Sequence, residues 1–284
     1  MSDVAVSVRS LHIHPVKSCA GIEVTEALLI ETGLEFDRAW MVVDTAGEFV
    51  TQRELPRMAL VRPTLKTFEM VLRAPGMLAL HIALDTVEAP VPVTVWNDRV
   101  DAYDMGDLSA RWFSDFLGRE VRLARFDPEQ RRLADPHWTG TFEAEYAFQD
   151  AFPLLVTSAA ALDELNRRLA SRGEPAVTMT RFRPNIVLDG LDAHGEDALD
   201  EITFATDDGP IRLRLVKPCA RCPIPDVDLL TGVAGHTVAD TLAGYRADPR
   251  RDGQVTFGMN AVIVEGVERA LRVGMAGSAN HRFD

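Results

Sequence analysis

A β-hairpin is predicted by residues 39–52, AWMVVDTAGEFVTQ, in which Gly47 stands in the turn. Other short strand-like runs lie on both sides of it, separated by Pro, Gly or Asp. They are VAVSVRSLHIHPV (4–16), MALVRP (58–63), FEMVLRA (68–74), LALHIAL (78–84) and VPVTVW (91–96). Many short strands at such spacing favour an antiparallel barrel or sandwich. The first hundred residues are therefore expected to be mostly strands.

A helix is expected to follow these strands. Asp107 can cap its free amides, and Gly118 ends it. The apolar residues predicted to share its core-facing side are Leu108, Trp112, Phe113, Phe116 and Leu117. Residues 126–150, FDPEQRRLADPHWTGTFEAEYAFQD, are rich in charge and poor in periodicity. We interpret them as a connection between two domains.

The second half of the chain combines helices with further strands. A helix is expected from Thr157 or Ser158 to just before Gly173, with three leucines turned inward: Leu162, Leu165 and Leu169. A shorter helix is expected at Thr237, where Asp240 completes a capping-box pattern. The strands expected here are NIVLDG (185–190), EITFAT (201–206), IRLRLVK (211–217), NAVIV (260–264) and LRVGM (271–275), with a hairpin turn at 207–209. The predicted fold class is mostly β with peripheral helices.

Charge and hydrophobicity exclude several classes of partner. The chain of 284 residues carries 43 acidic and 30 basic residues, a formal net charge of −13. Such a surface repels nucleic acid and anionic lipid, so we expect neither as a partner. No stretch approaches the roughly 18 apolar residues that span a membrane, and the start lacks a signal-peptide profile. We therefore expect a cytoplasmic protein.

Only three cysteines are present, and two of them form a CxxC pair. Cys219 and Cys222 lie in KPCARCP (217–223), after a predicted strand and between two prolines. Structural zinc usually needs four protein ligands, and no second CxxC or HxxxH exists here. A thioredoxin-like pair would start a helix in a βαβ unit. Zinc, a redox dithiol and two ordinary thiols all remain open for the pair taken alone.

Polar residues beside three other strand ends point to a pocket. Lys17 and Ser18 follow the first strand in HPVKSCAG (14–21), and Arg38 precedes another in FDRAW (36–40). Arg183 and Asn185 precede a third in RFRPNIVL (181–188). In an acidic chain, these groups together predict a cationic pocket for a phosphate or a heterocycle.

Five segments in order carry a family resemblance: HPVKSCAG, FDRAWMVVD (36–44), TQRELPRMALV (51–61), RFRPNIVLDG (181–190) and KPCARCPIPDVDLLTG (217–232). The chain resembles MOSC proteins with an N-terminal MOSC-associated barrel, which include mitochondrial amidoxime-reducing components and bacterial reductases of N-hydroxylated bases. The resemblance covers nearly the whole chain. It implies an N-terminal barrel-like domain at 1–122 and a β-barrel MOSC domain at 123–284, which share one cleft.

The resemblance also implies a cofactor and its site. Molybdenum–molybdopterin is the expected cofactor, with Cys222 as the metal ligand and catalytic residue, and pyridoxal phosphate is not expected. A metal already held by a dithiolene accepts a thiolate readily. The positions that match the family's cofactor-binding residues are Lys17, Ser18, Arg38, Arg183, Asn185, Ala220, Arg221 and Asn260.

The chain departs from the family pattern at several places. Ala151-Phe152 stand where eukaryotic members have Thr-Ser, and Asn260 stands where they have Tyr. Pro223 and Pro225 replace residues found in characterised reductases. The membrane anchor of the mitochondrial members and the ferredoxin domain of some bacterial members are expected to be missing.

The implied function is reduction of a small N-oxygenated compound. An external electron donor of ferredoxin or cytochrome type, with its own reductase, would restore the two electrons, and the cofactor would carry the difficult chemistry. The alternative is a non-enzymatic carrier or storage protein for the cofactor, or one that relays sulfur to it. A plain CxxC redox or zinc protein is the third interpretation.

Overall fold

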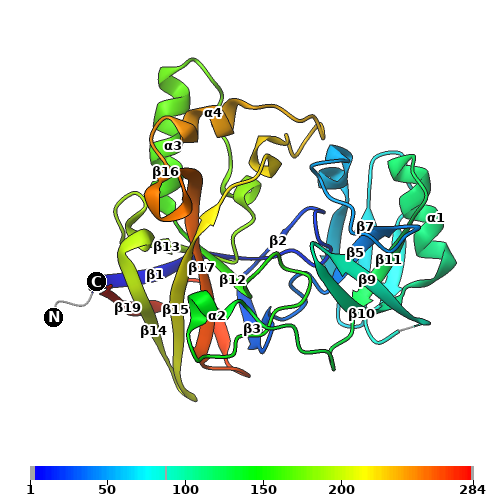
Figure 1. Cartoon of the computed structure of the whole chain (residues 1–284), viewed down its shortest axis with the longest axis horizontal. Coiled ribbons are helices and arrows are strands. Elements are labelled where there is room, and N and C mark those ends of the chain that lie inside the picture. Colours follow the sequence, from blue (N-terminus) through cyan, green and yellow to red (C-terminus); the bar gives the residue numbers. More distant parts are fainter. Residues whose placement is uncertain (1–3, 87, 283–284) are drawn as a thin grey trace.

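A closed barrel of seven strands is the largest element of the computed structural model, which describes residues 4–86 and 88–282 (Figure 1). Around it the order is β12-β13-β1-β19-β14-β15-β17, and β17 pairs with β12 to close the ring. The strands are β12 (Leu154–Ser158), β13 (Ile186–Asp189), β1 (Val4–Ile13), β19 (Ala276–His281), β14 (Leu199–Thr206), β15 (Gly209–Ala220) and β17 (Gln254–Glu265).

The barrel interior is filled by alternate residues of its strands. Ile202 and Phe204 on β14, and Leu213 and Leu215 on β15, are fully buried, whereas the residues between them are more exposed. This period of two gives one core-facing and one outward-facing side to each strand. The pair β12 and β13 is parallel, and the helix α3 (Ala159–Ser171) supplies the crossover that such a pair requires.

The start of the chain completes the barrel. β1 lies between β13 and β19, with both of which it pairs antiparallel. Short strands extend this arrangement: β2 (Ile22–Val24) on β1, β3 (Glu26–Ile30) with β4 (Gly33–Leu34) and β18 (Ala270–Arg272), and β16 (Ala247–Asp248) on β17. Strand pairing alone does not define independently folding units, so the domain ranges 1–122 and 123–284 stay a prediction.

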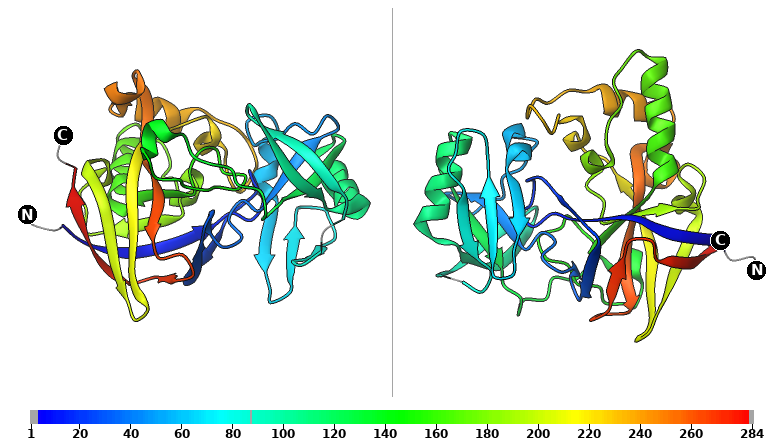
Figure 2. Two further views of the ribbon diagram at one scale, coloured as in Figure 1. Left: turned by 60° about the horizontal axis from the view of Figure 1, so that its bottom comes forward. Right: turned by 180° about the vertical axis from the view of Figure 1, so that it is seen from behind.

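A second β assembly lies beside the barrel (Figure 2). It contains a four-stranded sheet in the order β5-β11-β10-β9 and a three-stranded sheet in the order β6-β7-β8. Their bounds are β5 (Trp40–Asp44), β11 (Val121–Phe126), β10 (Asp98–Asp104), β9 (Pro90–Val95), β6 (Arg62–Leu65), β7 (Glu69–Arg73) and β8 (Leu80–Ala83). One core cluster joins both sheets to α1 (Gly106–Leu117). The predicted mostly β fold class is thus confirmed.

The hairpin predicted at 39–52 forms as expected. Asp44 ends β5, and its carboxylate accepts hydrogen bonds from the backbone N–H groups of Ala46 and Glu48 at 2.9 and 3.0 Å. Gly47 has φ of +83°, a backbone conformation that glycine adopts without strain. Val43 then pairs with Phe49 in the returning chain.

Two details predicted for α1 are wrong. Met105, and not Asp107, occupies the N-cap, and the carboxylate of Asp104 accepts the N–H of Gly106 at 2.7 Å. Leu108 is 73% exposed, because the buried face of this helix passes through Ser109 and Ala110 to the other predicted residues from Trp112 onward. Gly118 ends the helix in the left-handed conformation, as predicted.

The capping pattern predicted for α4 (Thr237–Ala243) is also wrong, although the helix begins at Thr237 as expected. Its N-cap is His236, and the carboxylate of Asp226 accepts hydrogen bonds from the N–H groups of Val238 and Ala239. A distant side chain thus caps the first turn of α4 in place of the predicted local pair of Thr237 and Asp240. By contrast, Ser158 caps α3 as predicted, by accepting the N–H of Ala161 at 3.3 Å.

The remaining helical segments are short. They are α2 (Pro136–Thr139), η1 (Pro56–Leu60), η2 (Met179–Phe182), η3 (Gly195–Ala198), η4 (Ile224–Asp226) and η5 (Pro249–Arg251). η1 corrects the strand predicted at MALVRP (58–63): Pro56 starts a helical turn, and the strand begins only at Arg62. In residues 4–86 and 88–282, no helix has the length and apolar character needed to cross a membrane.

Candidate functional site

A cavity of about 220 Å³ lies where side chains of the barrel meet those of the second β assembly. All nine residues that the sequence singled out line it: Lys17, Ser18, Arg38, Arg183, Asn185, Ala220, Arg221, Cys222 and Asn260. They come from both halves of the chain, so one cleft receives residues from both predicted domains. Their individual roles stay predictions.

Three of these residues have left-handed backbone conformations. The φ angles of Ser18, Arg38 and Arg183 are +65°, +52° and +57°. For residues other than glycine such angles cost free energy and persist only where surrounding contacts enforce them. Here the N–H of Arg38 donates to the carbonyl of His14 at 2.9 Å, and that of Arg183 to Thr180 at 3.2 Å. The loops that carry the cations are thus held in specific shapes.

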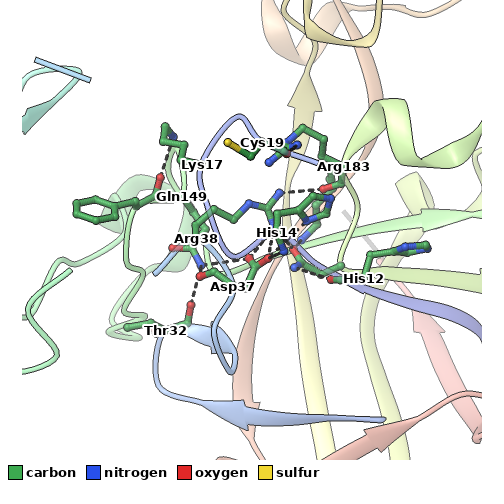
Figure 3. Close-up of polar contacts among 12 residues, drawn as sticks. His12, His14, Lys17, Cys19, Thr32, Asp37, Arg38, Gln149 and Arg183 are labelled. Carbon is green, nitrogen blue, oxygen red and sulfur yellow. Dashed lines mark hydrogen bonds and ion pairs between the residues drawn. The ribbon is translucent and has the colours of Figure 1, made fainter. Parts of the chain in front are cut away.

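Arg38 is fixed by a buried carboxylate. Its Nη1 donates to both carboxylate oxygens of Asp37, at 2.7 and 2.6 Å, and its Nη2 donates to the carbonyl of Arg183 at 2.9 Å (Figure 3). Asp37 also accepts the backbone N–H of His14 at 2.8 Å. Burial alone would raise the pKa of Asp37, but Arg38 and the hydrogen bonds outweigh burial and hold this pKa well below its ordinary value. Asp37 is therefore ionised and neutralises Arg38.

Asn185 is engaged by the backbone. Its Oδ1 accepts the N–H of Leu155 at 3.0 Å, and its Nδ2 donates to the carbonyl of His12 at 3.3 Å. Arg38 Nη1 lies 3.4 Å from the same Oδ1. The side chain therefore ties β1 and β12 together beneath the pocket and supports Arg38.

Lys17 is the second cation with a charge partner. Its Nζ donates to the carbonyl of Phe148 at 2.7 Å and to Asp150 Oδ1 at 2.5 Å, and Trp96 Nε1 donates to the same oxygen at 3.1 Å. Burial lowers the pKa of Lys17, and the carboxylate of Asp150 opposes that effect. The ammonium group is thus held in one place at the pocket wall.

Arg183 is one of the pocket cations whose donors are not all used. Its Nη1 donates to the carbonyl of Cys19, whereas its Nη2 is buried and has no hydrogen-bond partner among the described residues. Burial, together with the charge of Arg38, lowers the pKa of Arg183 to about 9, so the side chain is still charged at neutral pH. A buried donor without a partner is costly, and an anion in the pocket would satisfy it.

The two cysteines of the CxRC segment have different hydrogen-bond surroundings. Arg221 Nη1 donates to Sγ of Cys219 at 3.0 Å, and its Nη2 donates to the carbonyl of Phe182 at 2.9 Å. Both cysteines are free, half-buried and line the cavity, but the sulfur of Cys222 has no hydrogen-bond partner among the described residues. Arg221 therefore holds the sulfur of Cys219, whereas that of Cys222 is left available for a ligand.

The geometry argues against a zinc site at this pair. No group of three or more His, Cys, Asp or Glu side chains is placed to hold a metal ion in the described parts of the chain. Both cysteines are free. A single thiolate with a separately bound metal centre fits this donor set better than a four-ligand zinc knuckle.

Sequence reasoning missed other pocket residues, among them Arg53, Asp150, Lys217 and Arg251. Arg53 and Lys217 lie within two of the motif segments, so their positions carried a signal that was not used. Arg251 lies in DPRRDG (248–253), where no motif marks it. With these residues, seven basic side chains and one acidic side chain line the cavity of a chain whose net charge is −13. The site is therefore built for an anion.

Three of the positions that depart from the family pattern, Ala151, Phe152 and Asn260, also line the cavity, whereas Pro223 and Pro225 are not among its lining residues. Ala151 and Phe152 form part of its wall. Asn260 Nδ2 donates to the carbonyl of Lys217 at 3.2 Å, which fastens β17 to β15 next to the CxRC segment. The asparagine thus supports the strand that carries Cys219.

Two family models match the chain: the MOSC N-terminal beta barrel domain over residues 5–120 and the MOSC domain over residues 143–276. The chain is 35% identical over 254 residues to mitochondrial amidoxime-reducing component 1 of Homo sapiens, which covers 86% of this chain and 73% of that protein. It is 34% identical to component 2 of Rattus norvegicus over 256 residues, with the same coverage. It is 31% identical to the molybdenum cofactor sulfurase of Homo sapiens over 270 residues, covering 89% of this chain and 29% of the sulfurase.

Proposed function

Because the chain belongs to the family of MOSC proteins with an N-terminal MOSC barrel domain, we propose that it binds molybdenum–molybdopterin and reduces N-oxygenated compounds. The relatives include amidoxime-reducing components and a molybdenum cofactor sulfurase. The amidoxime-reducing components and the sulfurase share a function associated with the molybdenum cofactor. The observation that carries the proposal is the meeting of all nine predicted residues in one cationic pocket.

The residues present fit a cofactor that carries a phosphate. Arg183 offers a buried donor without a partner, and the Nε of Arg221 is likewise buried and without a partner among the described residues. Charge-assisted hydrogen bonds from guanidinium groups are the usual way to bind phosphate. Arg183, Arg221, Arg38 and Lys17 would hold the anionic end of the cofactor.

The sulfur ligand fits a molybdenum centre. Cys222 would supply a thiolate, a soft ligand suited to a metal that a dithiolene already binds. Cys219 is occupied by its contact with Arg221, so we assign it to support of the loop. When bound, the cofactor supplies a two-electron centre that can accept the oxygen of an N–O bond.

The chain itself would bind, orient and partly enclose the reactants. Its three cysteines cannot build a four-cysteine iron–sulfur centre, and no glycine-rich dinucleotide fingerprint follows a strand. Electrons would therefore come from a separate carrier of ferredoxin or cytochrome type. We place this reaction in the cytoplasm.

A second candidate function is transfer or storage of the cofactor, or relay of sulfur to it. The match to the sulfurase favours it, because this chain corresponds to a segment of a protein named for handling the cofactor. Both candidates need the same pocket. They differ in whether bound metal turns over a substrate.

Reduced viologen separates the two candidates, because it replaces the unknown electron carrier. Molybdenum-loaded protein should consume a hydroxylamine, an amidoxime or an N-oxide with this donor, and the Cys222→Ser protein should not. Inert wild-type protein that passes its cofactor to an apo-enzyme would reject the reductase and leave the carrier.

A further inference from the structure

The pocket contains more positive charge than its internal partners and a cofactor phosphate can balance. Of the seven basic side chains, Lys17 is paired with Asp150 and Arg38 with Asp37. The other five form no ion pair with a carboxylate among the described side chains. A phosphate monoester carries about two negative charges at neutral pH. About three positive charges are therefore left for another ligand.

Four of the five cations lie against aromatic rings: Arg221 on Phe182, and Arg53, Lys217 and Arg251 on tryptophans. Arg53 Cζ is 4.5 Å from the ring centroid of Trp96, which is 46% exposed. Lys217 Nζ is 5.0 Å from the ring centroid of Trp138, and Arg251 Cζ is 5.4 Å from the same ring. An aromatic face attracts a cation without neutralising its charge. These side chains are thus positioned but still able to bind an anion.

Lys217 and Arg251 repel each other across the shared ring. Burial lowers the pKa of Lys217 and the charge of Arg251 lowers it further, whereas the charge of Asp135 opposes both but does not outweigh them. Lys217 also lies 5.5 Å from the ring of Phe152, so its ammonium group is in a partly apolar setting. An anion near both cations would relieve this repulsion.

We propose that Lys217 and Arg251, with Arg53 from the other β assembly, select substrates that carry a carboxylate or phosphate in addition to the N–O group. This inference rests on the proposed reductase function and makes its substrate class specific. The ring of Phe152, which lines the cavity, favours a flat body between the anionic group and the N–O group. Lys217 and Arg251 are specificity-determining residues in this account and take no part in the chemistry.

A matched substrate pair tests the proposal: benzamidoxime and its 4-carboxylate, with reduced viologen as the electron source. Wild-type protein should favour the carboxylate by about tenfold or more in kcat/KM, the effect expected of one charge-assisted contact. Lys217→Gln and Arg251→Gln should each lose about tenfold on the carboxylate and change less than about twofold on the neutral compound. A 4-phosphate analogue then separates preference for phosphate from preference for carboxylate.

Arg57→Gln is the matched control. Arg57 is exposed and its Cζ lies 4.7 Å from the ring of Phe116, outside the cavity, so the control removes an arginine–ring contact without touching the pocket. Arg57→Gln should change kcat/KM for neither benzamidoxime nor its 4-carboxylate. Molybdenum content and thermal unfolding of all variants should match wild type, and Arg53→Gln replaces any variant that does not fold.

Binding of 4-carboxybenzamidine, measured by calorimetry, gives a readout without turnover. Inert protein that still binds this carboxylate-bearing amidine, about tenfold more weakly after Lys217→Gln, would reject the reductase and support the anion site. Equal turnover of both amidoximes by wild type would overturn the inference and leave the reductase. Variants that slow only when a protein donor replaces viologen would also overturn it, because the cations would then serve an acidic partner.

Discussion

Replacing Asp37 by Asn should destabilise the protein strongly and loosen the pocket. The side chain of Asp37 has no exposed surface and that of Arg38 has 12%, and two hydrogen bonds of 2.7 and 2.6 Å join them. The substitution keeps the shape but removes the charge that neutralises Arg38. Loss of one partner from a buried ion pair costs about 3–5 kcal/mol. We expect the free energy of unfolding to fall by that amount at neutral pH.

The pH dependence of this loss has a definite sign. The folded-state pKa of Asp37 lies below its ordinary value of 3.8. The carboxylate therefore contributes stability above that value, and this contribution is lost as the pH falls toward the folded-state pKa. The difference between wild type and Asp37→Asn should be largest near pH 7 and should shrink below about pH 4.

Urea denaturation followed by tryptophan fluorescence measures the loss, and Asp189→Asn is the control. Asp189 pairs with Arg9 at 3.5 Å on the surface, with side chains 42% and 66% exposed. An exposed pair contributes about 0–1 kcal/mol. Equal losses for Asp37→Asn and Asp189→Asn, or a difference independent of pH, would refute the buried ion pair as the support of the pocket.

Three further outcomes follow from the structure. Arg183→Gln should weaken cofactor binding about tenfold, which would be measured as a lower molybdenum content after gel filtration. An unchanged molybdenum content would show that Arg183 is not part of the anion site. Burial raises the pKa of Glu196 from its ordinary value of 4.5 to about 7, so ionising this side chain lowers the stability of the folded protein as the pH rises. The free energy of unfolding of Glu196→Gln should therefore equal that of wild type near pH 4 and exceed it by about 3 kcal/mol at pH 8. No gain at pH 8 would contradict this. Phe182→Ala removes a ring stacked on Phe257 at 3.9 Å and should cost about 3–5 kcal/mol in urea denaturation; a loss below about 1 kcal/mol would show that the site repacks.

Local patterns predicted much of the fold. The Asp44–Gly47 turn and the Ser158 cap of α3 depend on residues a few positions apart, so the sequence contains them in full. The alternation along β14 and β15 likewise predicts their buried faces. These features need no knowledge of distant contacts.

Features set by distant contacts could not be predicted in this way. β19 (Ala276–His281) has no apolar alternation that would predict it, and its Gly277 leaves room for the ring of Phe204, which a Cβ there would approach to 2.7 Å. Asp226 caps α4 from outside the helix. In both cases the deciding neighbour is far away in the sequence.

The candidate site likewise contains residues that the sequence predicted and residues that it did not. Short motifs and the family resemblance identified Lys17, Arg38, Arg183 and the CxRC segment, but not the side chains that hold them. The partner of Arg38 is the adjacent Asp37, whereas Lys17 pairs with Asp150 from a distant loop. Arg251 joins the pocket only through the fold.

Molybdenum content of Cys222→Ser and Cys219→Ser, made beside wild type in a molybdenum-replete host, tests the central claim most directly. Both thiols line the cavity, but Arg221 holds the sulfur of Cys219 and leaves that of Cys222 available. The account therefore predicts that Cys222→Ser loses the metal and that Cys219→Ser keeps most of it. Equal molybdenum in wild type and Cys222→Ser would contradict the assignment of the ligand. Equal loss in both variants would contradict it as well and would indicate a site shared by two thiols.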